Sequence, residues 1–338
     1  SHMASGNPLA SIISLTRGMF GDFHRLLVPL AWFELIFKSV VALLGFAEAA
    51  LLLTILVQTT GNSAITNNEI LDFLLSPSGL LIITLIGWSA ATFIVLEHLG
   101  VMAIVARFER GQTLTTLGIS GALASLILPL LRLKVKGVLC LIAASLPLAI
   151  TGGLAYALLI SRHDINYYLA DRPPAFLAAI AVAVVLGLIL LAVVAWAYVR
   201  TVFLFPIILY EDHPAADALW ESFERTRDRF RWLGSILLTW QLLGTLISLG
   251  LVWSFTMLAD LLLNVAANRF WVLIPLVTLL IVLETLLAAV VSFVLVALHC
   301  ILILRLYRRR NEELGLSLLE TSHAAPGPRE IPKIRHYL

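Results

Sequence analysis

Charged residues are scarce in this sequence. Asp, Glu, Lys and Arg make up 13% of its 338 residues, whereas an ordinary soluble domain carries about 25%. Hydrophobic residues reach 60%, and a chain of this composition cannot hide its apolar surface from water. A soluble globular fold is therefore excluded. The small net charge of +2 offers no strongly basic surface, and we expect no nucleic-acid partner.

Cysteines and soluble-enzyme motifs are also scarce. Cys140 and Cys300 both lie in apolar runs, which favours two small buried hydrophobic residues over a disulfide or a metal pair. The sequence has no Gly-rich phosphate loop, no His-Glu-x-x-His and no Gly-x-Ser-x-Gly. His299 is interpreted as a packed helix residue, because no Cys/His/Asp cluster has ligand spacing. We therefore expect neither a metal nor a cofactor in this chain.

Long apolar runs dominate what is present. The clearest is the run 80–106, which exceeds the ~20 residues that cross a bilayer. It follows a short one-sided outer helix in residues 64–77, whose start carries a capping box at Thr66 and Glu69 and whose end is broken by Pro77. The sequence predicts an all-α polytopic membrane protein with six transmembrane helices. The spans lie at about residues 27–57, 80–106, 138–160, 175–210, 233–258 and 271–305.

The remaining segments are assigned around these spans. Residues 1–3 are interpreted as a cloning remnant, residues 4–25 as a cytoplasmic interfacial lead-in to the membrane domain 26–310, and residues 311–338 as a polar tail or linker. Amphipathic patterns in 113–136 and 212–231 predict two helices on the cytoplasmic face. The order span, surface helix, span thus occurs twice, as in transporters built from parallel repeats.

The distribution of basic residues predicts the orientation. If both termini are cytoplasmic, the outer loops hold only Arg162, Arg172 and Arg269, and the other loop arginines and lysines lie inside. An excess of Lys and Arg in short cytoplasmic loops is what sets membrane topology. We therefore expect a multi-pass protein with both termini inside, and the first span to serve as its targeting signal.

Ionisable residues within the spans are the candidate functional residues, because each costs at least ~2.5 kcal/mol to hold in a bilayer. Glu34 and Lys38 are four residues apart and predict a structural ion pair. Glu97, followed by His98, and Arg200 lie equally far from the cytoplasmic ends of their spans, which predicts an interhelical Glu97–Arg200 pair. This pair is either a structural strut or part of a cavity in which Arg200 meets a lipid phosphate and Glu97 orients it.

Two further acids, Glu48 and Glu284, lie nearer the middle of the bilayer without an evident basic partner, so they are protonated or face water. The candidate substrate- or lipid-binding residues are Glu97, Arg200, Glu284, Glu48 and His98. In the most charged segment, arginines from Arg225 to Arg231 alternate with acids. A solvated face apposed to the membrane is the first interpretation, and attraction to anionic headgroups is the second.

Several segments together resemble a known family. They are residues 29–38, residues 64–77, Glu97 in the second span, Arg200 ahead of Pro206, and residues 218–223 leading to Arg229-Phe230. In the same order, over about residues 26–307, they are similar to the membrane domain at the N-terminus of bacterial membrane-bound glycerophosphodiester phosphodiesterases.

This resemblance implies a division of labour. Enzymes of the family cleave glycerophosphodiesters to glycerol-3-phosphate and an alcohol in a soluble TIM-barrel domain, with a His-Arg-Gly motif, a Glu-Asn-Thr motif and a divalent cation. Neither motif occurs here, since His24-Arg25 is followed by Leu26. Residues 331–338 have the basic character expected just before a further span.

The function implied is that of a membrane domain that anchors a hydrolase to the bacterial inner membrane and presents lipid-derived substrate, with no catalytic residues of its own. The expected partners are membrane lipids, anionic headgroups among them, and a C-terminal or separate phosphodiesterase domain. The oligomeric state stays open. The alternatives are a stand-alone transporter or translocator of lipid or small solutes, and a purely structural anchor.

Overall fold

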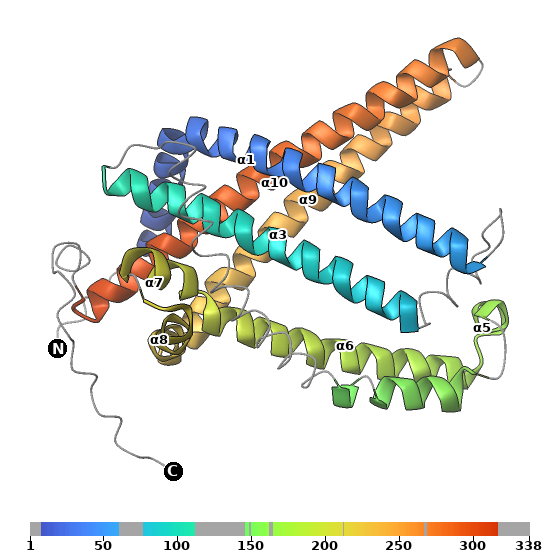
Figure 1. Cartoon of the computed structure of the whole chain (residues 1–338), viewed down its shortest axis with the longest axis horizontal. Coiled ribbons are helices and arrows are strands. Elements are labelled where there is room, and N and C mark those ends of the chain that lie inside the picture. Colours follow the sequence, from blue (N-terminus) through green and yellow to red (C-terminus); the bar gives the residue numbers. More distant parts are fainter. Residues whose placement is uncertain are drawn as a thin grey trace.

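The computed structural model describes residues 8–60, 77–111, 146–148, 150–161, 165–211, 213–266 and 269–316. In these residues every regular element is an α-helix (Figure 1), so the all-α prediction is confirmed for the described chain. The helices are α1 (Pro8–Thr60), α3 (Pro77–Glu109), α5 (Ile165–Asp171), α6 (Pro174–Thr201), α7 (Leu204–Glu211), α8 (Ala215–Arg227), α9 (Phe230–Ala266) and α10 (Phe270–Glu313).

Five helical stretches of the described chain are long and apolar enough to cross a membrane. They are Arg17–Ile55, Thr84–Glu109, Pro174–Glu211, Phe230–Val265 and Trp271–Glu313. The predicted third span, 138–160, is represented by a shorter apolar helix, Leu146–Leu159. The predicted number of six spans is therefore not confirmed. The predicted outer helix before Pro77 and the predicted surface helix 113–136 lie outside the described residues.

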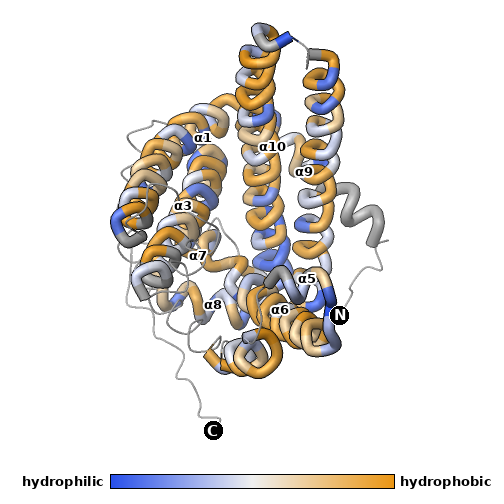
Figure 2. Tube along the Cα trace, turned by 90° about the vertical axis from the view of Figure 1, so that its right-hand side faces the viewer, coloured by the Kyte–Doolittle hydropathy of each residue, from blue (hydrophilic) through white to orange (hydrophobic). Residues whose placement is uncertain are grey.

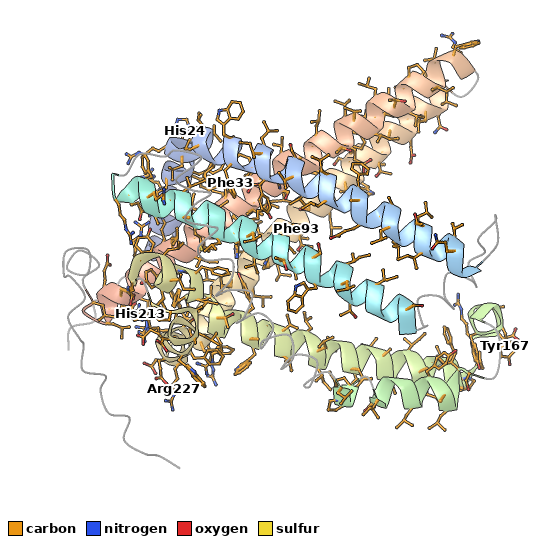
Figure 3. All side chains as sticks on the ribbon, viewed as in Figure 1. His24, Phe33, Phe93, Tyr167, His213 and Arg227 are labelled. Atoms are coloured by element: carbon orange, nitrogen blue, oxygen red, sulfur yellow. The ribbon has the colours of Figure 1, made fainter. Side chains whose placement is uncertain are left out.

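The helices extend beyond the predicted spans. α1 begins at Pro8, so the predicted interfacial lead-in and the first span form one helix, with Pro29 inside it. Proline removes one backbone hydrogen bond and crowds the preceding turn, and α1 bends in Figure 1, with His24 near the bend in Figure 3. α10 has 44 residues and is ~66 Å long at 1.5 Å per residue, well beyond a ~30 Å hydrocarbon core.

The predicted span 175–210 corresponds to the apolar stretch Pro174–Glu211, which consists of two helices rather than one. α6 ends at Thr201 and α7 begins at Leu204, with a turn at Val202 and Phe203 between them. The cause is Pro206, which cannot donate to the carbonyl four residues earlier. Ser222 of α8 stabilises the break, because its hydroxyl donates to Arg200 O at 2.7 Å and accepts from Phe203 N at 3.2 Å.

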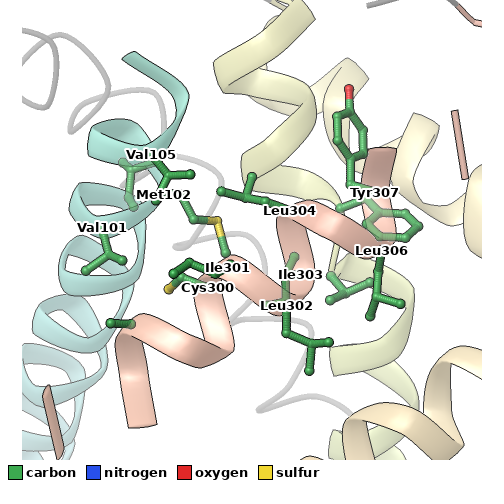
Figure 4. Close-up of a cluster of buried hydrophobic side chains, with 14 of the residues drawn as sticks. Val101, Met102, Val105, Cys300, Ile301, Leu302, Ile303, Leu304, Leu306 and Tyr307 are labelled. Carbon is green, nitrogen blue, oxygen red and sulfur yellow. The ribbon is translucent and has the colours of Figure 1, made fainter. Parts of the chain in front are cut away.

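The buried core lies at one end of the helices. α10 packs against α1, α3 and α9, α6 against α8 and α9, and α3 against α7. Figure 4 shows Val101, Met102 and Val105 of α3 facing Cys300 and Ile301 of α10. Away from this core the helices splay apart (Figure 1) and consist mostly of apolar residues (Figure 2), many of which are exposed. Such a surface suits contact with lipid tails.

Candidate functional site

A half-buried ammonium group joins three helices. Lys38 of α1 lies with its Nζ 3.3 Å from Glu34 Oε2, one turn earlier, and 3.2 Å from Glu97 Oε1 of α3. The same Nζ donates to Ser292 Oγ of α10 at 2.8 Å. The predicted Glu34–Lys38 pair is thus present, but as part of a larger cluster. An ammonium has three donors, and here each of them has a neighbour.

The cluster around Lys38 contains more acidic than basic side chains. Two carboxylates, those of Glu34 and Glu97, share one ammonium. Glu34 is the poorer partner: its side chain is 3% exposed, and neither of its oxygens has a well-aligned hydrogen bond within the described residues. The Glu34–Lys38 contact is therefore one of proximity rather than good hydrogen-bond geometry. Lys38 is better matched to Glu97 and Ser292, which it reaches across the helix interfaces.

The predicted Glu97–Arg200 pair is wrong. Glu97 pairs with Lys38, and no ion pair links Glu97 to Arg200 in the part of the chain that the structure describes. Arg200 donates instead from Nη1 to Phe223 O at 3.3 Å, and its guanidinium lies 5.2 Å from the ring centre of Phe230. The reason is helix adjacency: α6 packs against α8 and α9, whereas α3 packs against α1, α10 and α7.

A cavity of about 380 Å³ opens beside Lys38. It follows α1 from Phe37 to Glu48, is bounded on the other sides by α3 and α10, and is polar at both ends. Lys38, Glu97 and Ser292 form one end. Glu48 forms the other and accepts a 2.5 Å hydrogen bond from Ser89. Its predicted lack of a basic partner agrees with the ion pairs of the described residues, none of which includes Glu48. The lining between is apolar: Phe37, Val41, Gly45, Ala90, Phe93 and Ile94.

The two ends of this cavity are well separated. Lys38 and Glu48 are ten residues apart on one helix, which corresponds to ~15 Å along the axis. One end offers an ammonium, a hydroxyl and the Glu97 carboxylate, and the other offers the Glu48 carboxylate. Such a site can hold an elongated molecule with an anionic group at one end and a cationic or hydroxyl-bearing group at the other, with apolar contacts between them.

The other predicted site residues do not line this cavity. The His98 ring packs edge-on against His299 at 5.8 Å, and its Nδ1 lies 2.8 Å from Ile94 O. His299 Nε2 is hydrogen-bonded to the Tyr198 hydroxyl at 2.5 Å, which agrees with a packed helix residue. Glu284 is exposed on the splayed part of α10. Within the described residues no group of three or more His, Cys, Asp or Glu can hold a metal ion.

One buried charge was not foreseen from the sequence. Arg225 of α8 is only 4% exposed, although its segment was interpreted as a solvated face. It donates to Glu211 at 2.5 and 2.8 Å, to Glu221 at 2.9 Å and to Asn311 at 2.9 Å. Burial disfavours the charged guanidinium, but the hydrogen bonds and charge of Glu211, reinforced by Glu221, outweigh this and raise the pKa of Arg225.

A signal for this residue was available in the sequence. Ala218, Ser222 and Arg225 are spaced by four and three residues, so they share one face of α8, and all three are buried. Small residues on that face let α8 approach its neighbours closely. Arg225 thereby reaches the end of α10, where Tyr307 also donates to Glu211.

Further ion pairs and a side chain to backbone hydrogen bond connect helices at the same end of the bundle. Arg305 of α10 donates to Asp22 of α1 at 2.5 Å, and Arg308 pairs with Glu109 at the end of α3. Arg110 donates to Leu209 O of α7 at 2.7 Å. Ion pairs and hydrogen bonds therefore connect α1, α3, α7, α8 and α10 at this end of the bundle.

Comparison with known proteins assigns the chain to a family. A family model described as the membrane domain of glycerophosphoryl diester phosphodiesterase matches residues 17–316. Neither the curated proteins nor the solved structures that were compared with the chain match it. The matched region takes in the five apolar helices and both ends of the cavity beside Lys38. The chain is thus a multi-pass membrane protein that belongs to the family of glycerophosphoryl diester phosphodiesterase membrane domains.

Proposed function

We propose that this membrane domain anchors a phosphodiesterase to the bacterial inner membrane and presents it with a lipid-derived glycerophosphodiester held between α1, α3 and α10. The observation that carries the proposal is the cavity beside Lys38, which has a cation at one end and carboxylates at both. A structural anchor alone does not require an accessible polar cavity within apolar helices, where each charge is costly.

The charge balance of the cavity limits which glycerophosphodiesters can bind there. Lys38 is the only cation among the described lining residues, and Glu48 and Glu97 are both acids. A diester with a net negative charge would meet excess carboxylate. A zwitterionic diester, such as glycerophosphoethanolamine, matches the charges better: its phosphate suits Lys38 and Ser292, and its ammonium group and glycerol hydroxyls suit carboxylates such as Glu48. Glu97 holds the Lys38 ammonium until the phosphate takes its place.

The hydrolysis itself is assigned to another domain. The hydrolases of this family use a divalent cation, and the described residues of this chain provide no group of three acidic, histidine or cysteine ligands for one. These residues therefore do not fit the cation. This chain contributes binding and orientation only, and a C-terminal or separate hydrolase domain supplies the bond cleavage.

The direction of the helices and the distribution of arginines support a cytoplasmic position for both termini. α3 and α6 both end at the charged end of the bundle, where α3 contacts α7. The two helices run in the same direction, which favours one more membrane crossing in the chain between them. This supports six crossings with both termini on one side. The arginines gather at that end, which the positive-inside rule assigns to the cytoplasm. The hydrolase would then act on the cytoplasmic side.

A binding experiment with matched variants tests the cavity. Glycerophosphoethanolamine is titrated by calorimetry into the purified chain in detergent, with the anionic diester glycerophosphoglycerol as comparison. Glu48→Gln and Glu284→Gln are the same change in two spans, and only Glu48 lines the cavity. We expect Glu48→Gln to weaken binding of the zwitterion about tenfold, because a charge-assisted hydrogen bond is lost, and Glu284→Gln to leave it unchanged.

A second variant tests whether the cavity itself is needed for binding, without changing any charge. Gly45 lines the cavity, and a Cβ added there would meet no atom within 4 Å. Gly45→Leu therefore fills the cavity while every charge is retained, and we expect it to abolish binding. If Glu48→Gln, Gly45→Leu and wild type all bind the zwitterion equally, the cavity is not the site. A folded wild type that binds neither diester supports the structural anchor instead.

A further inference from the structure

A second cavity, of about 560 Å³, lies where α6, α8 and α9 meet. It is lined by four arginines: Arg200 at the end of α6, Arg227 at the end of α8, and Arg229 and Arg231 around the start of α9. It shares no lining residue with the cavity beside Lys38. Figure 3 shows Arg227 at the periphery of the bundle, next to α8.

The charges around this second cavity are not balanced. Asp228 is the only acid among its described lining residues, and the Asp228 carboxylate already lies 3.4 Å from Arg310 Nη2. Arg229 is paired with Glu313 at 3.4 Å. Within the described residues, Arg227 and Arg231 have no ion-pair partner. Like charges that converge on one cavity repel each other, so the arrangement is stabilised when an anion binds.

Arg200 adds an unsatisfied donor. It lies in the last turn of the otherwise apolar helix α6, and its Nε is buried without a hydrogen-bond partner among the described residues. The rest of the guanidinium is held by Phe223 O and by the face of Phe230. A buried donor without an acceptor is unfavourable. Guanidinium groups present planar pairs of N–H donors, the geometry that suits phosphate oxygens.

We infer that this second cavity binds a phosphate group, with Arg200, Arg227 and Arg231 as its ligands. The surrounding aromatic residues favour a lipid headgroup over a soluble phosphate. Trp196 and Trp220 both contact Phe223, with ring centres 5.9 and 6.1 Å apart, and Trp220 is 71% exposed. Exposed tryptophans gather at the headgroup level of membranes. The inference does not rest on the proposed function, because the two cavities are separate.

Calorimetric titration of the whole chain in detergent tests this inference with three probes. They are dihexanoyl phosphatidylglycerol, dihexanoyl phosphatidylcholine and inorganic phosphate. The test variant is Arg227→Gln/Arg231→Gln, and both side chains are exposed, so folding does not depend on them. Arg269→Gln, at the start of α10 and far from the cavity, removes an exposed arginine as the control. We expect the double variant to bind phosphatidylglycerol about tenfold to a hundredfold more weakly.

The probes distinguish the two sources of phosphate. Binding of phosphatidylglycerol without binding of inorganic phosphate identifies a headgroup site, and binding of inorganic phosphate identifies a site for soluble phosphoesters. Either result supports the inference if the double variant loses it and Arg269→Gln retains it. Arg200→Lys, which keeps the charge but not the fork of donors, should also bind more weakly. Equal binding by wild type and the double variant, or an equal loss in Arg269→Gln, overturns the inference.

Discussion

The contact between α1 and α3 depends on a glycine, which makes the pairing of these helices testable. A Cβ added at Gly100 would lie 2.1 Å from Cζ of Phe33, and 2.7 and 2.9 Å from its Cε atoms. Figure 3 shows Phe33 between the two helices. At Gly87, on the same helix, an added Cβ would meet no atom within 4 Å. Gly100→Ala and Gly87→Ala are therefore a matched pair.

The size of the effect follows from the contact distances. Carbon atoms pack at about 3.5–4.0 Å, so the Phe33 ring must move by roughly 1.4 Å to admit the methyl group. Its stacking on Phe37, at 5.6 Å and 20°, opposes this movement. Overpacking of this kind costs about 1–3 kcal/mol. Replacing glycine by alanine gains about 0.5–1 kcal/mol of helix stability at either position, so the difference between the variants isolates the packing cost.

Unfolding by SDS in mixed micelles, followed by the loss of helical circular dichroism, measures this difference. We expect Gly87→Ala to match wild type or exceed it by up to about 1 kcal/mol, and Gly100→Ala to be about 1–3 kcal/mol less stable than Gly87→Ala. Because Phe37 lines the first cavity, Gly100→Ala should also weaken ligand binding there. If the two variants are equally stable, the close approach of α1 to α3 is wrong.

Two further predictions concern the charged end. Arg225→Met leaves the carboxylate of Glu211 without its main partner and should lower the free energy of unfolding by about 3–5 kcal/mol. Arg227 is exposed on the same helix, and Arg227→Met should change that free energy by no more than about 0.5 kcal/mol. The same SDS titration measures both variants, and equal losses would contradict the buried network. If the arginine-rich end is cytoplasmic, alkaline phosphatase fused after Arg172 or Arg269 should be active, and alkaline phosphatase fused after Gly111 or Glu313 should be inactive. The reverse pattern would contradict the proposed orientation.

The sequence predicted the helices well because apolar runs are a strong signal. The predicted span 80–106 appears as α3, Pro77–Glu109, with three more residues at each end. Predicted span ends fell short most at the charged end of the bundle. There Arg308 and Glu109 belong to long helices, and they are paired with each other. A charge in a sequence indicates the end of the apolar layer, not the end of the helix.

Helix neighbours were harder to predict than helices. The Glu34–Lys38 pair was foreseen because four residues on one helix fix the distance between two side chains. The pairing of Glu97 with Arg200 rested on equal depth, but depth leaves the partner helix undetermined. Only the packing of α3 against α1 gives Glu97 its actual partner, Lys38. A single sequence carries no signal for that packing.

The error about Glu97 and Arg200 leads to a further expectation. Predicted as one pair, the two residues line separate cavities with opposite charge balance: carboxylates outnumber the cation around Lys38, and guanidinium groups outnumber the carboxylate around Arg200. A direct pair would have neutralised both. Kept apart, they leave one proposed site that should disfavour anionic diesters and one that should favour an anion. The two cavities should therefore select different headgroups, with zwitterionic ligands held beside Lys38 and phosphatidylglycerol beside Arg200.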